Sequence, residues 1–402
     1  MYSMRRERFL VEATLLDYTD GDSLDISSSV MSINVKRDYI SNSFPLFVVN
    51  LRLTEELRSK IRDNEVTLDL KVDKYQDLDD EQTEETETPV ITGRVMDIVI
   101  KPYKKPFSTA NIREEDDEDT SLQTNTISLI DYQFSGIPEQ LILKNIEVVN
   151  EIYENAKISD ILINIISKTE TGKIFIDTVD NKEREDSLLI PPMNIIPAIK
   201  FLQEYYGIYN SKMGLFFDLT GTYIFKHFNK SRSYTNTFEI IVPEAIDIDD
   251  DIIFTSIQID EDDINARLYL KNSPNIDSST EISMDTIGQT AVFSSYDENF
   301  ETVKRIYSND TSNEKTRYFW NSNQNKVLEE SILNTVRISQ FTSIPLANID
   351  PNYFNIDTLY TFSTPQESVD GIYMLIESDF SFSTTDKLHY TGITNLTLAK
   401  VE

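Results

Sequence analysis

The sequence contains no cysteine, which excludes disulfide bonds, thiolate metal sites and a cysteine nucleophile. It contains only two histidines, His227 and His389, so a three-histidine metal site is also excluded. Both histidines lie at the ends of predicted strands and need no catalytic role there. With 10 glycines in 402 residues, the chain has little material for phosphate-binding loops, and it contains no P-loop, dinucleotide-binding or nucleophile-elbow motif.

Basic residues are in deficit, because 37 Lys and Arg stand against 69 Asp and Glu and leave a formal net charge of −32. That charge opposes contact with phosphate backbones and anionic lipid, so we expect no specific nucleic-acid binding and no membrane partner. Long apolar runs are also missing, since no stretch approaches the roughly 18 apolar residues of a membrane span. In residues 1–18, Glu12 interrupts the apolar run and no cleavage site follows, which favours an opening strand over a signal peptide.

Apolar and aromatic residues are abundant instead. Hydrophobic residues make up 39% of the chain, which includes 20 Tyr and 21 Phe, and 402 residues imply two or three packed units. Residues 9–143 contain short strand-like runs separated by polar connections, and this pattern predicts a small antiparallel barrel or sandwich. Two acidic runs inside it, residues 77–89 and 113–121, are interpreted as solvated loops.

Helical periodicity begins after residue 150. Five apolar residues share one face of a predicted helix, namely Ile158, Ile161, Leu162, Ile165 and Ile166. A second helix follows Asn194, which can cap it, and Gly207 ends it. Residues 214–225 then predict a hairpin, and residues 325–341 predict a third helix. We therefore expect a mixed α/β unit, with strands returning in the last part of the chain.

Carboxylates are the main candidates for chemistry. Residues 247–254 and 260–263 could hold a hard cation if they paired across a hairpin, but a solvated acidic face is the favoured interpretation. The 69 carboxylates allow many pairs of the kind that a glycan hydrolase uses, so no particular pair can be chosen. We therefore predict no catalytic, cofactor-binding or metal-binding residue, and no cofactor.

Aromatic side chains are concentrated in the second helix and the hairpin. The set consists of Phe201, Tyr205, Tyr206, Tyr209, Phe216 and Phe217. Their spacing predicts that most of them are buried, while an excess of tyrosine at the edge of such a unit is typical of an intersubunit surface. The sequence therefore favours assembly over catalysis.

The order of these elements resembles the baseplate hub proteins of contractile-tailed bacteriophages, the family of the trimeric T-even phage hub. The resemblance is best over residues 190–226 and 326–400. In the first range, prolines precede a helix that ends near a glycine, and an aromatic hairpin follows; the second range holds a helix and closing barrel strands. It implies a homotrimeric ring of apparent sixfold symmetry that adapts the sixfold tail tube to the threefold central spike. It also implies a virion structural protein and not an enzyme, located in the tail baseplate after assembly in the host cytoplasm.

We thus predict an α+β multidomain fold with two β-barrel domains and an α/β domain, which forms a trimeric ring. The predicted boundaries are 1–145 for the N-terminal β-barrel, 146–228 and 276–340 for the α/β domain, and 229–275 and 341–402 for the second β-barrel. The predicted partners are the spike, the tail tube and other baseplate proteins. A cell-wall glycan hydrolase and a receptor-binding tail component are the alternatives. Part of the acidic charge is expected either in the ring lumen or on loops and the outer surface.

Overall fold

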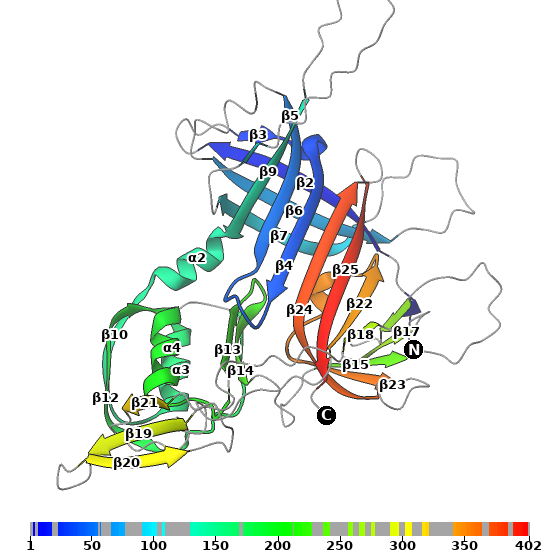
Figure 1. Cartoon of the computed structure of the whole chain (residues 1–402). Coiled ribbons are helices and arrows are strands. Elements are labelled where there is room, and N and C mark those ends of the chain that lie inside the picture. Colours follow the sequence, from blue (N-terminus) through cyan, green and yellow to red (C-terminus); the bar gives the residue numbers. More distant parts are fainter. Residues whose placement is uncertain are drawn as a thin grey trace, which may run out of the picture.

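Strands form most of the described part of the chain, and the computed structural model in Figure 1 arranges them around three hydrophobic cores. The described residues are 3–4, 7–17, 23–54, 57, 66–76, 91–102, 107–108, 129–168, 172–211, 213–226, 236–241, 256–259, 265–269, 275–277, 290–296, 302–307, 316–320, 341–363, 370–384 and 389–400.

Eight antiparallel strands close into a barrel in the order β2, β6, β7, β9, β5, β4, β24, β25 and back to β2. Their bounds are β2 Glu7–Asp17, β4 Val30–Asp38, β5 Leu46–Thr54, β6 Val66–Gln76, β7 Ile91–Pro102, β9 Leu129–Pro138, β24 Gly371–Thr384 and β25 His389–Lys400. In β5, Phe47, Val49 and Leu51 are buried and alternate with less buried residues. This period of two turns one face of each strand into the barrel core.

The barrel is closed by the last two strands of the chain. Phe9 of β2 pairs with Tyr390 of β25, and Val35 of β4 pairs with Phe380 of β24. The rings of Phe9 and Phe382 meet edge to face with centroids 4.7 Å apart. Strand residues close to both ends of the sequence therefore complete one core.

The other parts of β24 and β25 continue the same hydrogen-bonded sheet beyond the barrel, toward the lower right of Figure 1 near both chain termini, and we call this continuation the second sheet. Its further strands are β1 Ser3–Met4, β15 Asn236–Ile241, β16 Ser256–Ile259, β17 Asn265–Tyr269, β18 Asn275–Asp277, β22 Phe341–Ala347 and β23 Thr358–Ser363. Aromatic rings fill the second-sheet core: Tyr360 stacks on Phe238 at 5.7 Å, and Phe362 lies 4.5 Å from Tyr373.

Shorter elements complete the β structure. They are β3 Ser23–Asp25, β8 Phe107–Ser108, the 3-10 turns η1 Ser27–Ser29 and η2 Pro351–Tyr353, and a separate sheet of β19 Thr290–Tyr296, β20 Thr302–Tyr307 and β21 Thr316–Trp320.

A helical unit lies on the lower left of Figure 1, joined to the barrel through α2. Its elements are α2 Glu139–Ile146, β10 Val148–Lys157, α3 Ile158–Ser167, β11 Lys173–Ile176, β12 Arg184–Asn194, α4 Ile195–Tyr205, β13 Met213–Phe217 and β14 Gly221–Lys226. Strands β10 and β12 form an antiparallel ribbon, and α3 and α4 pack on it. All five predicted core residues of α3 are buried, which confirms the helical face read from the sequence.

Hairpin β13–β14 is a wall between two cores. Phe216, Tyr223 and Phe225 pack into the second-sheet core, while Phe217 and Ile224 pack into the helical-unit core. Alternate side chains of a strand point to opposite faces, so a hairpin that is apolar on both faces must be covered on both. This is why the segment is so rich in aromatic residues.

Both ends of α4 are fixed by hydrogen bonds. At its start, the side chain of Asn194 makes no capping bond, and the Ile196 amide instead donates to Asn145 Oδ1 at 3.2 Å. At its end, the Gly207 amide donates to the Leu202 carbonyl at 3.0 Å, and Gly207 has φ of 69°. The predicted left-handed stop at Gly207 is confirmed.

The predicted α+β multidomain fold with two barrels and an α/β domain is wrong, because the described structure is mostly β and contains one closed eight-stranded barrel. The reason lies in β10 and β12. They form an antiparallel ribbon whose outer side chains are largely exposed, so charged residues interrupt the apolar pattern of both strands. The sequence pattern consequently indicates the helices but not the ribbon that they cover.

Several predictions concern residues outside the described ranges. The two acidic runs at 77–89 and 113–121, His227, the stretches 247–254 and 260–263 and nearly all of the third helix at 325–341 lie there. The trimeric ring and the domain boundaries at 1–145, 146–228, 276–340, 229–275 and 341–402 stay predictions.

Leu202→Ala tests the packing of α4. Leu202 is fully buried in the helical-unit core, so truncation should lower the free energy of unfolding by about 2–5 kcal/mol through lost burial and a residual cavity. Urea unfolding measures the change. Lys200→Ala, on the exposed side of the same helix, is the control and should leave the midpoint nearly unchanged.

Gly207→Ala tests the helix stop. A Cβ disfavours the left-handed backbone, so the variant should lose about 1–2 kcal/mol, while Gly207→Asn should lose less because asparagine tolerates that region better. The two unfolding midpoints give the comparison. Equal losses in both variants would mean that crowding of the buried site, and not φ, decides the cost.

Candidate functional site

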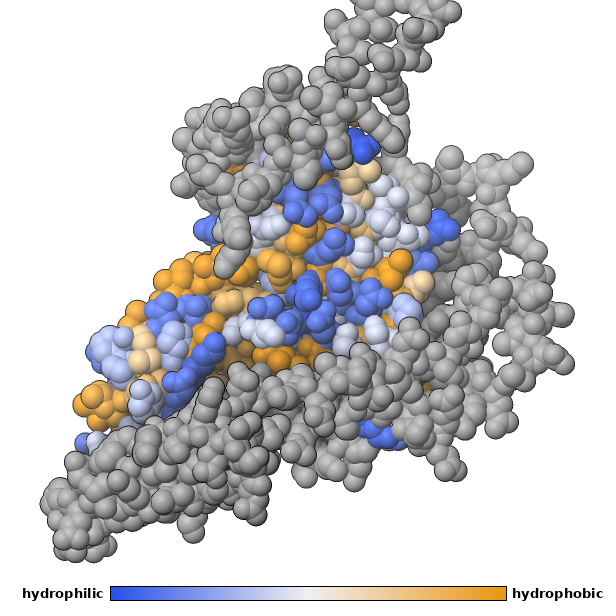
Figure 2. Space-filling model, viewed as in Figure 1, coloured by the Kyte–Doolittle hydropathy of each residue, from blue (hydrophilic) through white to orange (hydrophobic). Residues whose placement is uncertain are grey.

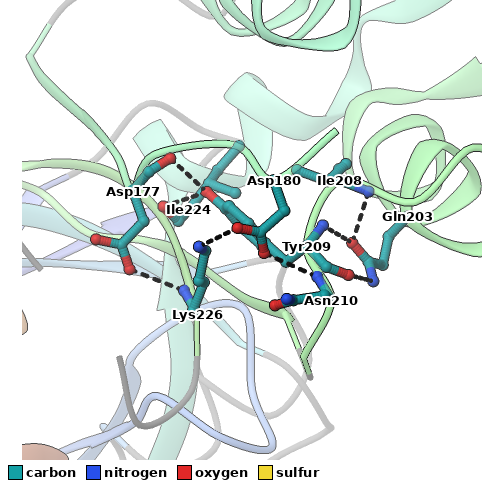
Figure 3. Close-up of polar contacts among 8 residues, drawn as sticks. All are labelled: Asp177, Asp180, Gln203, Ile208, Tyr209, Asn210, Ile224 and Lys226. Carbon is teal, nitrogen blue, oxygen red and sulfur yellow. Dashed lines mark hydrogen bonds and ion pairs between the residues drawn. The ribbon is translucent and has the colours of Figure 1, made fainter. Parts of the chain in front are cut away.

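A polar network joins the end of α4 to β14 (Figure 3). Lys226 Nζ lies 2.5 Å from Asp180 Oδ1, and Asp180 Oδ2 accepts a bond from the Asn210 amide at 2.9 Å. The Lys226 amide donates to Asp177 Oδ2 at 2.9 Å. The carboxylates are therefore engaged with groups of the same chain.

The second half of the network holds the turn after α4. Gln203 Oε1 accepts from the amides of Ile208 and Tyr209 at 3.0 and 2.9 Å, and Gln203 Nε2 donates to the Tyr209 carbonyl at 3.0 Å. The Tyr209 hydroxyl donates to the carbonyls of Asp177 and Ile224. Bonds of this kind fix a backbone turn, so we assign the network to structure and not to ligand binding.

A buried ion pair joins the barrel to hairpin β13–β14. Arg37 Nε of β4 lies 2.9 Å from Asp218 Oδ2, which directly follows β13, and both side chains are almost fully buried. The Arg37 guanidinium also stacks over the Phe380 ring at 4.7 Å. Burial opposes the guanidinium charge, but the Asp218 carboxylate outweighs it, and the pKa of Arg37 is raised.

Two further ion pairs cross between units. Lys74 Nζ of β6 lies 2.7 Å from Asp350 Oδ2 next to η2, which ties the barrel to the second sheet. Lys173 of β11 pairs with the buried Asp357, which ties the helical unit to the second sheet. Together with Arg37 and Asp218, these pairs fix how the three units are oriented, because charges buried in this way must be paired.

The helical unit also carries apolar side chains on its surface. Seven of them are more than half exposed, namely Leu143 and Ile146 of α2, Val148 and Ile152 of β10, Ile163 of α3, Leu189 of β12 and Tyr205 of α4. Figure 2 shows apolar surface along the side of the molecule where α2 and β10 lie in Figure 1. Contiguous apolar surface of this kind marks interaction sites in soluble proteins.

Three of the six residues in the aromatic cluster are buried, namely Tyr209, Phe216 and Phe217, so the predicted burial holds for half of them. Tyr205 is 60% exposed, and its ring lies tilted against that of Phe201 with the centroids 4.6 Å apart. His389 opens β25 opposite Leu10 of β2. Within the described ranges no three His, Cys, Asp or Glu side chains are placed to hold a metal ion. No helix within those ranges is long and apolar enough to cross a membrane.

These features define a β-structured scaffold whose charged groups lock its units together and whose exposed apolar side chains suit contact with other proteins. Residues 4–401 match the family model for Bacteriophage PBS1 gene 109 protein, and the chain belongs to that family. The phage origin implied by the resemblance to baseplate hubs is thus confirmed. No curated protein matches the chain in sequence.

Several solved structures are similar along nearly the whole chain. One is the tail protein from Neisseria meningitidis MC58, with 10% identity, 97% of this chain and 96% of that chain covered, and a TM-score of 0.49. Another is the prophage MuSo2 43 kDa tail protein from Shewanella oneidensis, with 10% identity, 96% of both chains covered and a TM-score of 0.47. The Francisella PdpA-VgrG complex, half-lidded, gives 9% identity, 99% and 58% coverage and a TM-score of 0.46.

Arg37→Met tests the buried ion pair. The variant leaves the Asp218 carboxylate buried and unpaired, so it should lose about 3–5 kcal/mol of unfolding free energy, whereas Arg37→Met combined with Asp218→Leu should regain most of it. Urea unfolding gives the double-mutant cycle. If the double variant were as unstable as the single one, packing and not the unpaired charge would be the cause.

The matched control is the exposed pair Arg52 and Asp131, which has the same 2.9 Å separation but side chains more than 40% exposed. Arg52→Met should cost less than about 1 kcal/mol, because solvent screens the pair.

Proposed function

We propose that this chain is a virion structural protein, a homotrimeric baseplate hub that adapts the sixfold tail tube of a phage to its threefold central spike. Membership in a phage protein family supports the proposal, and so does the order of sequence elements that resembles baseplate hubs. In this role the protein is not an enzyme. Its partners are the spike, the tail tube and other baseplate proteins, and it enters the virion after assembly in the host cytoplasm.

The observation that carries the proposal is the continuity of β24 and β25 through two cores. Phe380 and Phe382 belong to the barrel core, while Tyr373 and Leu375 of the same strand belong to the second-sheet core. Units joined by a flexible linker move relative to each other. Units that share hydrogen-bonded strands cannot bend at those strands without disrupting the strand pairing and the packing of both cores. A protein that must hold a tube and a spike in fixed alignment needs this rigidity.

Ion pairs made by buried aspartates support the same role. Arg37 and Asp218 join the barrel to the wall of the helical unit, and Lys173 and Asp357 join the helical unit to the second sheet. Breaking either pair to rotate one unit would leave a buried aspartate, Asp218 or Asp357, without its partner, which costs several kcal/mol. The three units therefore form one body, as a load-transmitting adapter requires.

The proposal predicts a trimer. Light scattering of the purified chain, alone and with its spike partner, should give three times the 46.4 kDa chain mass, and negative-stain images should contain closed rings. Antibody labelling of virions should mark the end of the tail. A chain that is monomeric under both conditions, or that releases soluble fragments from purified peptidoglycan, would contradict the proposal and favour a hydrolase.

A further inference from the structure

The β10–β12 ribbon has two faces with different surroundings. Val149, Leu188 and Ile190 point to the inside, where they are buried against α3 and α4. Ile152 and Leu189 are cross-strand neighbours on the outside, and they are 65% and 53% exposed. We call the outer surface formed by Leu143, Ile146, Val148, Ile152 and Leu189 the ribbon face.

No part of the chain that the structure describes covers the ribbon face, since all five side chains are more than half exposed. In Figure 1 the ribbon is the outermost layer of the helical unit, with the helices between it and β13–β14. Five such side chains present an apolar area on the order of a few hundred Å², which is large for a monomer surface and suits the centre of an interface.

We propose that the ribbon face is the surface on which a second copy of this chain docks in the ring. The inference rests on the proposed homotrimer and assigns its contact. A standard interface buries about 800 Å² on each partner, so the ribbon face supplies the apolar centre and its surroundings supply the rim.

Charge favours a second copy over an unrelated partner. Each chain carries a net charge of −32, so two copies repel wherever their acidic surfaces meet. The part of the ribbon between Val148 and Ile152 on β10, and between Leu189 and Asn194 on β12, offers an approach without that penalty, because its exposed residues there, Asn150 and Pro192, are uncharged. A basic partner would gain more from the acidic surface than from this uncharged one. Contacts between permanent copies are also more apolar than transient ones.

The acidic residues beside the ribbon face lie at its limits. Glu147 is exposed between Ile146 and Val148, and Glu154 is exposed one step of the strand face beyond Ile152. In a threefold ring the contact is head to tail, so the ribbon face of one copy meets a different surface of the next. Two Ile152 side chains therefore do not meet across the contact.

The test is the double variant Ile152→Lys and Leu189→Lys. Both residues are exposed, so the fold should persist, which circular dichroism and the unfolding midpoint check. The two lysines change the net charge from −32 to −30, so general repulsion between copies falls. We expect dissociation to monomers at concentrations where the wild-type chain is a trimer, with a shift of at least about tenfold in the dissociation midpoint.

The matched control is Ile91→Lys. Ile91 is 54% exposed on β7 of the barrel, away from the ribbon face, and its variant should remain trimeric. A trimeric wild type that is unaffected by the double variant would overturn this inference and leave the proposed function standing. A wild-type chain that is monomeric alone and with its spike partner would overturn both.

A cysteine probe tests the geometry of the contact. The chain has no cysteine, so Ile152→Cys introduces a single thiol. Head-to-tail docking predicts that this thiol becomes protected from alkylation in the trimer and forms no disulfide-linked dimer under oxidation. Disulfide-linked dimers in high yield would mean that two ribbon faces meet around a twofold axis, and that result would overturn docking in a threefold ring.

Discussion

The β24–β25 hairpin has to satisfy two hydrophobic cores at once, and the arrangement of the molecule depends on it. Toward the connection between the two strands, Phe382 and Tyr390 close the barrel against β4 and β2. Toward their other ends, Tyr373 and Leu398 pack with β22 and β23. The register between the strands shifts at Leu375 and Glu377, and a bulge of this kind bends a strand. The bend lies where the hairpin passes from one core to the other.

Hairpin β13–β14 likewise contributes side chains to two cores, those of the second sheet and of the helical unit. Its alternate side chains are divided between two cores, so neither core is complete without it. Gly214 allows the close approach that this requires, because a Cβ at that position would lie 2.2 Å from the Phe225 ring. Because neighbouring cores share strands, the packing of each core depends on the next. A substitution in a shared strand therefore disturbs both of the cores that it lines.

Ion pairs complement the shared walls where apolar packing alone would leave the relative orientation open. Apolar contact is non-directional, whereas a buried carboxylate has to lie beside a particular charged partner. Asp218 and Asp357 are each 1% exposed, and each is paired with a basic residue of another unit. The ribbon face differs from these buried charges, because its five side chains are uncharged and lie outside all three cores. It is therefore available to a neighbouring molecule in an otherwise acidic protein.

The sequence determined the local features of this protein. The spacing of Ile158, Ile161 and Leu162 defined the buried face of α3, and Gly207 ended α4, because both follow from the geometry of a single helix. The lack of cysteine and the deficit of basic residues excluded whole classes of site. Tertiary structure decided the rest. Strand pairing links residues as far apart as Phe9 and Tyr390, and no local pattern specifies such a partner.

The same limit explains what the sequence could not assign at the candidate site. Charged side chains on the exposed half of β10 and β12 interrupt the alternating apolar pattern of these strands. The ribbon and its apolar outer face are therefore visible only in the tertiary structure. Arg37 and Asp218 are 181 positions apart and unremarkable as single residues. They become a buried pair because β4 of the barrel and the end of β13 meet in the folded chain. Each charge needs the other only after folding has removed water from both side chains.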